Sequence, residues 1–214
     1  NFFLINKIDL DKNVRKSSQN KLDDLFKEFN SDKGSKFLLN GNLISGHNYS
    51  PFYEKYFEKF KLKKNLNILE IGSLRGSSAA SFYHYFNNPN IYCLDINPFQ
   101  IQIFSKKIRK VFVDSQSKKI LKNTIKFLNT NFDIIIDDGS HNIRDQIITL
   151  SAFLPNLNNK GIYVIEDISQ YLASSNLNPD NLPYGIKGFL LNIKSEQNLF
   201  NYLTEEEKFF LRDN

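Results

Sequence analysis

Two adjacent carboxylates and an imidazole come directly after an apolar run in the segment FDIIIDDGSH, residues 132–141. A second acidic pair, Glu166-Asp167, closes the similar run GIYVIED. Carboxylate oxygens are the ligands that a hard cation prefers, and an imidazole with a pKa near neutral can accept a proton. Each group also has a structural explanation, because an acid after a strand often caps the next helix and His141 can simply begin one. Together the two pairs favour metal binding and proton transfer.

Five apolar runs of this kind recur along the chain and predict the elements that position these groups. They are residues 67–72, 91–96, 110–115, 132–138 and 161–167. Each is nearly continuous in Ile, Val, Leu and Tyr, which is typical of strands that are covered on both faces. Segments with helical spacing separate several of them. The pattern predicts βαβ units and an α/β fold with a doubly wound, mainly parallel sheet.

Acidic residues lie at or near the carboxyl end of every one of these runs. They are Glu70, Asp95, Asp114, the pair Asp137-Asp138 and the pair Glu166-Asp167. In an open α/β sheet, ligands bind outside the carboxyl ends of the strands. One such acid is readily explained as a cap, but five in phase predict a shared ligand crevice.

The segment ILEIGSLRGSSAASF, residues 68–82, has the order of a strand, a glycine turn and a helix start. Gly72 permits a tight turn and Gly76 allows the backbone to approach a ligand, while the helix N-terminus offers free N–H groups. A G-x-x-x-G spacing is a weak dinucleotide fingerprint, and a purely structural turn remains an alternative.

The acids around this turn indicate which ligand it would take. Glu70 would repel a pyrophosphate but suits a ligand that carries an amino group. Asp95 ends the next strand, where a carboxylate can accept from both hydroxyls of a ribose. Asp114 and Ser115 end the third strand, where they can meet the edge of an adenine.

With these residues, the stretch from Leu66 to Asp167 resembles class I S-adenosylmethionine-dependent methyltransferases. EIGSLRG stands for the E/D-x-G-x-G-x-G of that superfamily and departs from it at Ser73-Leu74, where glycine is commoner. The resemblance implies S-adenosyl-L-methionine as cofactor. The residues expected to bind it are Tyr49, Glu70, Gly72, Ser73, Arg75, Gly76, Asp95, Asp114, Ser115 and Asp137, although Asp137 can instead hold its turn.

FDIIIDDGSH with YVIED, and SDKGS…HNYSPFYEKYF before them, resemble a narrower group. These are the metal-dependent sugar O-methyltransferases of the mycinamicin and macrocin type, with cephalosporin-hydroxylase-like proteins nearby. The resemblance implies Mg²⁺, or another divalent cation, held by Asp138, Glu166 and Asp167. It also implies that Asp138 and His141 are catalytic, with His141 as general base.

The implied function is O-methylation of a saccharide hydroxyl in carbohydrate modification or polysaccharide biosynthesis. The acceptor would be a nucleotide sugar, a surface polysaccharide unit or a glycosylated natural product. Alternatives are the same chemistry on a catechol or phosphate-type group, or a non-catalytic protein with this fold. An NAD-dependent oxidoreductase is disfavoured by Glu70 in the turn and by the missing G-x-G-x-x-G.

Residues 1–60 are expected to form an N-terminal helical or lid segment, and residues 61–214 the catalytic domain, within one globular domain. Helices are expected at 22–29 and after Ser50, with a Gly/Asn/Ser-rich loop between them that carries His47, a candidate for substrate or cofactor contact. His84 is expected to pack in a helix. After residue 167 a loop and two helices are expected, with the last strands of the sheet missing.

The composition narrows the class of protein further. A chain of 214 residues with 41% hydrophobic residues can bury a real core. The net charge of +5 is spread out rather than clustered, so no nucleic-acid partner is expected. The single cysteine, Cys93, excludes an internal disulfide and lies in an apolar run, where burial is expected. No run is long enough to cross a bilayer, so a cytoplasmic protein is expected. The resemblance to the sugar O-methyltransferases implies a homo-oligomer.

Overall fold

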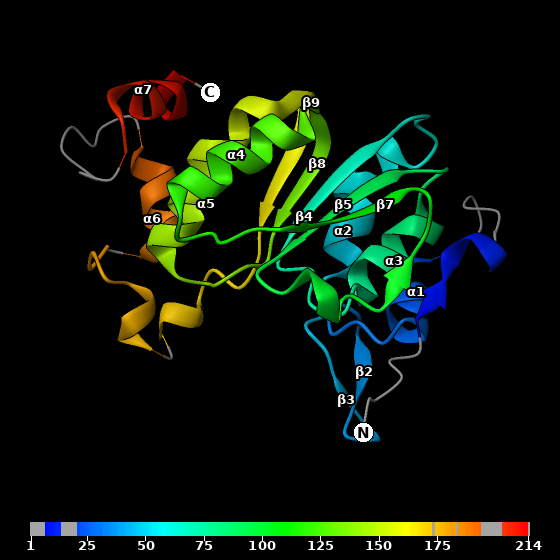
Figure 1. The fold of residues 1–214 in the computed structure, drawn as a ribbon. Helices are drawn as coiled ribbons and strands as arrows, with labels where there is room; N and C mark the ends of the chain where they lie inside the picture. The colour runs from blue at the N-terminus through cyan, green and yellow to red at the C-terminus, as the bar shows by residue number, and fades with distance from the viewer. Residues whose placement is uncertain (1–6, 14–20, 173, 183, 194–202, 214) are drawn as a thin grey trace. The chain divides into compact units, whose positions relative to one another are not determined.

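The computed structural model describes residues 7–13, 21–172, 174–182, 184–193 and 203–213 (Figure 1). The chain divides into two compact units, residues 1–111 and 112–214. This division falls inside the predicted catalytic domain, and the functional boundary near residue 60 stays a prediction. The elements of each unit are therefore described by themselves.

The main sheet contains the five predicted strands. They are β4 (Asn67–Ile71), β5 (Asn90–Asp95), β7 (Ile108–Phe112), β8 (Phe132–Asp137) and β9 (Leu157–Ile165). Their order in the sheet is β7-β5-β4-β8-β9. β4 pairs with β5 and β8 pairs with β9, both in parallel. The predicted α/β fold with a mainly parallel sheet is confirmed.

The register of β8 and β9 explains how their acidic ends come together. Every residue of β8 is buried, so neither face of the strand is exposed to solvent. Asp137 lies opposite Ile165. The residues that follow these two positions therefore leave the sheet side by side, at its carboxyl edge.

Three α-helices of the first unit enclose an aromatic core. They are α1 (Leu22–Glu28), α2 (Ser50–Phe57) and α3 (Ser77–Tyr85). Phe82 of α3 lies edge-on to Phe26 of α1 and to Tyr53 of α2, with ring centroids 5.7 and 5.6 Å apart. Phe57 is also fully buried against this cluster. The helices predicted at 22–29 and after Ser50 are both present.

The loop predicted between these helices is wrong in its middle part, because a β-hairpin lies there. β2 (Lys36–Leu39) pairs antiparallel with β3 (Asn42–Ser45). Asn40 and Gly41 turn the chain with φ of 52° and 80°, which is the backbone that an Asn-Gly hairpin turn requires. In Figure 1 the hairpin carries the labels β2 and β3 and projects away from the neighbouring elements of the first unit. The Asn-Gly pair between two apolar stretches was the sequence signal for it.

The second unit packs its helices around α5 (Ile143–Phe153). α4 (Lys118–Leu128), α6 (Gly185–Asn192) and α7 (Glu205–Asp213) complete this set. Ile147, fully buried, lies in one apolar cluster with Ile186 and Phe189 of α6. Within the described residues no strand follows β9, and two α-helices do, as predicted.

Short elements complete the chain. β1 (Ile8–Asp9) pairs in parallel with β6 (Ile103–Phe104). The 3-10 helices are η1 (Leu10–Asn13), η3 (Glu58–Phe60), η4 (Pro98–Gln100), η5 (Leu154–Asn156), η6 (Gln170–Leu172) and η7 (Ser175–Leu177). None of the described helices combines the length and the apolar character needed to cross a membrane.

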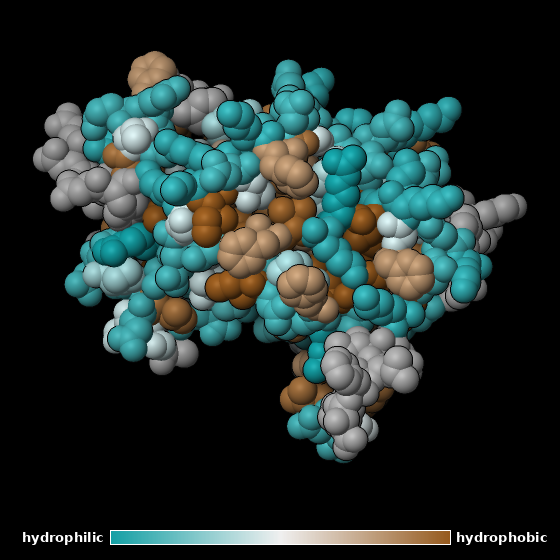
Figure 2. Space-filling view, viewed as in Figure 1, coloured by the Kyte–Doolittle hydropathy of each residue, from teal (hydrophilic) through white to brown (hydrophobic). Residues whose placement is uncertain are grey.

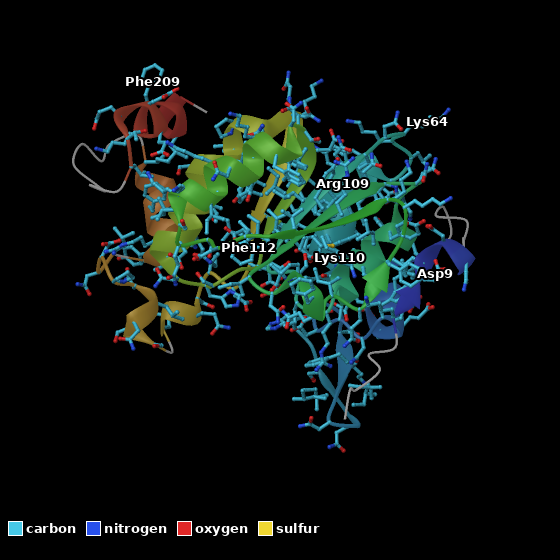
Figure 3. All side chains as sticks on the ribbon, viewed as in Figure 1. Asp9, Lys64, Arg109, Lys110, Phe112 and Phe209 are labelled. Carbon is cyan, nitrogen blue, oxygen red and sulfur yellow. The ribbon has the colours of Figure 1, made fainter. Side chains whose placement is uncertain are left out.

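Much of the positive charge lies on the surface. Polar residues cover most of the face shown in Figure 2, with apolar patches between them. Arg109 and Lys110 of the edge strand β7 are labelled in Figure 3. The Arg109 guanidinium carbon lies 5.4 Å from the centroid of the Tyr92 ring, and Lys110 Nζ donates to the Ile101 carbonyl at 2.8 Å. Such basic side chains also discourage pairing of an edge strand with another chain.

Candidate active site

Asp138, His141 and Asp167 form a compact cluster in the second unit. Each offers one ligand atom, and these atoms all lie within 4.8 Å of one another. His141 Nε2 lies 3.9 Å from Asp167 Oδ2. All three residues are half-buried, so the cluster is reachable from solvent but partly desolvated. Two carboxylates and an imidazole at this spacing suit a divalent cation or a proton-transfer site.

Two members of the cluster have an unusual backbone. His141 and Asp167 have φ of 58° and 52°, in the left-handed region that Asp and His tolerate better than most residues. Two hydrogen bonds of Ser140 hold the turn at His141. Ser140 Oγ donates to Asp145 Oδ2 at 2.6 Å and accepts from the Asn142 N–H at 3.3 Å. Such constrained turns are frequent at functional sites.

Asp167 is held by the residues that follow it. The Gln170 N–H donates to the Asp167 carbonyl at 3.1 Å, and Gln170 Nε2 donates to Asp167 Oδ2 at 3.3 Å. The carboxylate of Asp167 is thereby oriented by η6, the short helix after β9. Its position beside His141 does not depend on that histidine alone.

Asp137 is buried and braces the turn after β8. Its carboxylate accepts from the hydroxyl of Thr149 on α5 and from the Gly139 N–H at 3.2 Å. Burial, with the charges of Asp138 and Asp145, raises the pKa of Asp137 to about 7, against the effect of these two hydrogen bonds. The structure thus shows the turn-holding role, while cofactor contact by Asp137 stays a prediction.

Glu166 is not one of the three clustered residues. Its side chain is buried, and its backbone N–H donates to the Asp137 carbonyl at 2.9 Å, which continues the β8–β9 ladder. Its predicted role as a metal ligand stays a prediction.

Asp114 and Ser115 follow β7 in the second unit and are half-buried. Asp114 Oδ1 accepts from the Gln116 N–H at 3.0 Å. Burial raises the pKa of Asp145, and the negative charge of Asp114 adds to this rise. Asp114 therefore lies near the first turn of α5, where its predicted adenine contact is untested.

The glycine turn of the first unit has the predicted form. Gly72, Leu74 and Gly76 all have positive φ, of 82°, 45° and 86°. Gly76 is the residue before α3, and a Cβ at this position would lie 2.8 Å from Ile103 Cγ1. Conformation and space therefore both require glycine at residue 76. Arg75 beside it is exposed.

The two acids near this turn bind their own chain. Glu70 is fully buried and accepts from the hydroxyl of Ser78, in the first turn of α3. Asp95 Oδ2 accepts from the Leu74 N–H at 2.8 Å, and Asp95 Oδ1 accepts from the Asn97 N–H at 2.8 Å. Ser73 is also buried, and its hydroxyl donates to the Glu70 carbonyl at 3.2 Å. These residues shape the turn, and their predicted contacts with a cofactor stay predictions.

His47 and Tyr49 lie in the segment before α2. Their rings stack with centroids 5.2 Å apart, and the Tyr49 N–H donates to the Lys33 carbonyl at 2.8 Å. The His47 ring is exposed and therefore accessible to a ligand. His84 is buried and stacks on Phe29 at 5.2 Å, which is the packing role that its sequence predicted.

Three buried polar residues of α5 were missed by the sequence analysis. Asp145, Gln146 and Thr149 are almost inaccessible, yet each bonds to a turn of the site. Their spacing was the signal, because Asp145 and Thr149 are four residues apart and interrupt an otherwise apolar face.

The sequence of this chain matches known methyltransferases. Residues 69–168 match a family described as a methyltransferase domain. Demethylmacrocin O-methyltransferase of Streptomyces fradiae is 31% identical over 130 residues, which are 57% of this chain and 32% of the relative. Mycinamicin VI 2''-O-methyltransferase of Micromonospora griseorubida is 29% identical over 129 residues, with 57% and 32% covered. The chain spans about a third of the length of these curated relatives.

A solved structure of MycE methyltransferase from the mycinamycin biosynthetic pathway, in complex with Mg and SAH, has the same fold. It aligns with a TM-score of 0.67 and 24% identity over 83% of this chain and 48% of its own. The MycE complex that also contains mycinamycin VI aligns with a TM-score of 0.68 and 23% identity over 84% and 50%. Residues 69–168 therefore match a methyltransferase domain, and the chain has the class I fold of MycE and is similar in sequence to the macrocin- and mycinamicin-type sugar O-methyltransferases, as its motifs predicted.

Proposed function

We propose that the protein transfers a methyl group from S-adenosyl-L-methionine to a hydroxyl of a saccharide, with a divalent cation at the site. The observation that carries this proposal is the cluster of Asp138, His141 and Asp167. It lies after two adjacent parallel strands, at the sheet edge where α/β enzymes bind ligands.

The proposed chemistry requires a base at this cluster. A sugar hydroxyl is a poor nucleophile while it keeps its proton. As its oxygen bonds to the methyl carbon, the sulfur–methyl bond breaks and S-adenosylhomocysteine leaves. The hydroxyl proton then needs an acceptor, and His141 Nε2 is the nitrogen that faces the Asp167 carboxylate at 3.9 Å. General-base help of this kind is worth about 10²–10⁴-fold in rate.

The carboxylates of the cluster fit a hard cation. Mg²⁺ prefers oxygen ligands, so Asp138 and Asp167 would hold it, with the buried Glu166 as the further predicted ligand. When bound, the ion would lower the pKa of the acceptor hydroxyl and orient it. His141 is then left to take the proton. Mg in the MycE complexes supports the choice of ion.

The glycine turn of the first unit is the proposed cofactor-binding element. Its three positive-φ residues lead the chain into α3, and the first N–H groups of a helix have no partner within the helix. The proposed cofactor contacts are Tyr49, Glu70, Gly72, Ser73, Arg75, Gly76, Asp95, Asp114, Ser115 and Asp137. SAH in the MycE complexes supports this ligand.

The acceptor is proposed to be a sugar of a glycosylated natural product, a polysaccharide unit or a nucleotide sugar. The matched relatives include a tetracenomycin rhamnosyl 2'-O-methyltransferase of Streptomyces olivaceus, and one MycE complex contains mycinamycin VI. A cytoplasmic location and a homo-oligomeric state belong to the same proposal.

Calorimetric titration with S-adenosylhomocysteine, with and without Mg²⁺, tests the cofactor first. We expect saturable binding, followed by Mg²⁺-dependent methylation in a panel of sugar, catechol and phosphate acceptors. Absence of binding under both conditions would refute the cofactor assignment. Methylation confined to catechols would refute the acceptor class, and turnover that survives EDTA would refute the metal.

A further inference from the structure

Three buried polar side-chain atoms of the second unit have no hydrogen-bond partner among the residues that the structure describes. They are His141 Nδ1, Gln146 Oε1 and the Tyr163 hydroxyl oxygen. The first two are chemically complementary, because a ring nitrogen can carry a hydrogen and an amide oxygen can only accept one. Leaving both unsatisfied would cost free energy. A hydrogen bond between them would remove both penalties.

The start of α5 puts these two residues at paired positions on either side of the helix cap. Asn142 caps the helix, and its side chain accepts from the Arg144 N–H at 3.0 Å. His141 is therefore the residue before the cap, and Gln146 is the fourth residue of the helix. Side chains at these two positions commonly pack against each other at helix N-termini. The capping geometry therefore favours contact between these two side chains.

The amide of Gln146 is already oriented. Its side chain is only 3% exposed, and Nε2 donates to the Glu166 carbonyl at 3.4 Å. This bond ties α5 to the end of β9. With the NH₂ group committed to that carbonyl, the oxygen of the same amide is the atom left to accept.

We propose that Gln146 is a positioning residue that selects the tautomer of His141. In neutral His141 the hydrogen lies on Nδ1 and is donated to Gln146 Oε1, directly or through one water molecule. The Nε2 lone pair then remains free on the side of Asp138 and Asp167. This inference rests on the proposed function, because only a base that accepts through Nε2 needs this tautomer. In the opposite tautomer Nε2 carries a hydrogen and cannot accept the hydroxyl proton.

Nitrogen NMR of the ¹⁵N-histidine-labelled protein tests the tautomer without acceptor or cofactor. The chain has only three histidines, and His141→Gln identifies the resonance of residue 141. At a pH where His141 is neutral, we expect the Nδ1–H form in the wild type. Gln146→Leu should shift His141 toward the Nε2–H form, whereas Gln146→Glu, which keeps an acceptor, should retain Nδ1–H.

Ser151→Ala is the matched control, because Ser151 is a buried polar residue of the same helix whose hydroxyl donates to the Ile148 carbonyl at 2.9 Å. It should leave the His141 signal unchanged. An unchanged far-UV circular dichroism spectrum and urea-unfolding midpoint report that each variant is folded. An Nε2–H form in the wild type, or a tautomer that Gln146→Leu does not change, would overturn the proposal.

Kinetics provide the second readout. Gln146→Leu should lower kcat by about 10–100-fold, as loss of a partner that orients a functional histidine commonly does, with little change in KM or in S-adenosylhomocysteine affinity. Gln146→Glu should recover part of this loss. A shifted tautomer with unchanged kcat would also overturn the positioning role. A wild type that methylates no acceptor would instead count against the proposed function, because the NMR result does not depend on turnover.

Discussion

The two units use acidic residues at strand ends in opposite ways. In the first unit, Glu70 and Asp95 are buried and accept hydrogen bonds from the turn that they hold. In the second unit, Asp138 and Asp167 are half-buried and lie beside an imidazole. All four are carboxylic acids at or just beyond the carboxyl end of a strand. The comparison shows that such acids differ in burial and in partners: some brace the backbone, and others lie half-buried beside an imidazole.

The pair Asp137-Asp138 repeats this contrast within two residues. Successive side chains of a strand point to opposite faces, so Asp137 turns into the protein toward Thr149. Asp138, one residue later, is part of the cluster with His141. One acid supports the turn, and its neighbour is the acid for which we propose a chemical role.

The largest effect is expected from Asp138→Ala. Loss of a presented carboxylate should lower turnover by about 10³-fold or more and abolish the response to Mg²⁺, while the free energy of unfolding changes little. Steady-state kinetics over a Mg²⁺ series and urea unfolding check both parts. Asp9→Asn, at a partly exposed acid in the first unit, is the control and should keep full activity. A strong loss of stability in Asp138→Ala would contradict the contrast between the units.

Asp95→Ala should, unlike Asp138→Ala, lower the free energy of unfolding. Asp95 accepts three hydrogen bonds, including one from Gln100 Nε2 at 2.9 Å. Bonds to a charged group contribute about 1.5–3 kcal/mol, so we expect a loss of about 2–3 kcal/mol in the free energy of unfolding, measured in urea. An Asp95→Ala protein as stable as the wild type would show that Asp95 does not brace the turn.

Two glycines of the first unit have left-handed backbone but differ in how closely other atoms surround them. Gly76→Ala adds a Cβ 2.8 Å from Ile103 Cγ1, whereas the Cβ at Gly41 meets nothing within 4 Å. Gly41→Ala should cost about 1–2 kcal/mol from backbone strain alone. Gly76→Ala should cost more and weaken S-adenosylhomocysteine binding. Thermal unfolding and calorimetry measure the two effects, and equal losses would exclude the crowding at residue 76.

The smallest effect is expected at Asp23, an acid of the first unit that is not at a strand end. Burial alone would raise its pKa, but Lys27 at 2.6 Å and hydrogen bonds from Ser35 and Ser50 lower the pKa below its ordinary value of 3.8. The ionised form therefore stabilises the folded state above about pH 4, and this contribution is lost as the pH falls further. Asp23→Asn should cost about 1 kcal/mol at pH 7, with the difference shrinking toward pH 3. A difference that is constant with pH would refute this.

Much of the fold follows from local patterns in the chain. Near-continuous apolar runs predicted the strands, because a strand covered on both faces carries mostly apolar residues. The hairpin β2–β3 was missed because polar residues around it resemble a loop, although Asn40-Gly41 encodes the turn. The acids at strand ends were also visible, since the carboxyl ends of parallel strands meet at one edge.

The sequence by itself determined the strands, the turn glycines and the set of candidate acids, because these depend on side-chain type and on spacing of a few residues. Only the tertiary structure decided which acids brace and which lie with His141. That choice depends on burial and on partners distant in the sequence, such as Asp138 with Asp167 and Asp137 with Thr149. The same holds for Gln146, whose role depends on a helix start and on the end of another strand.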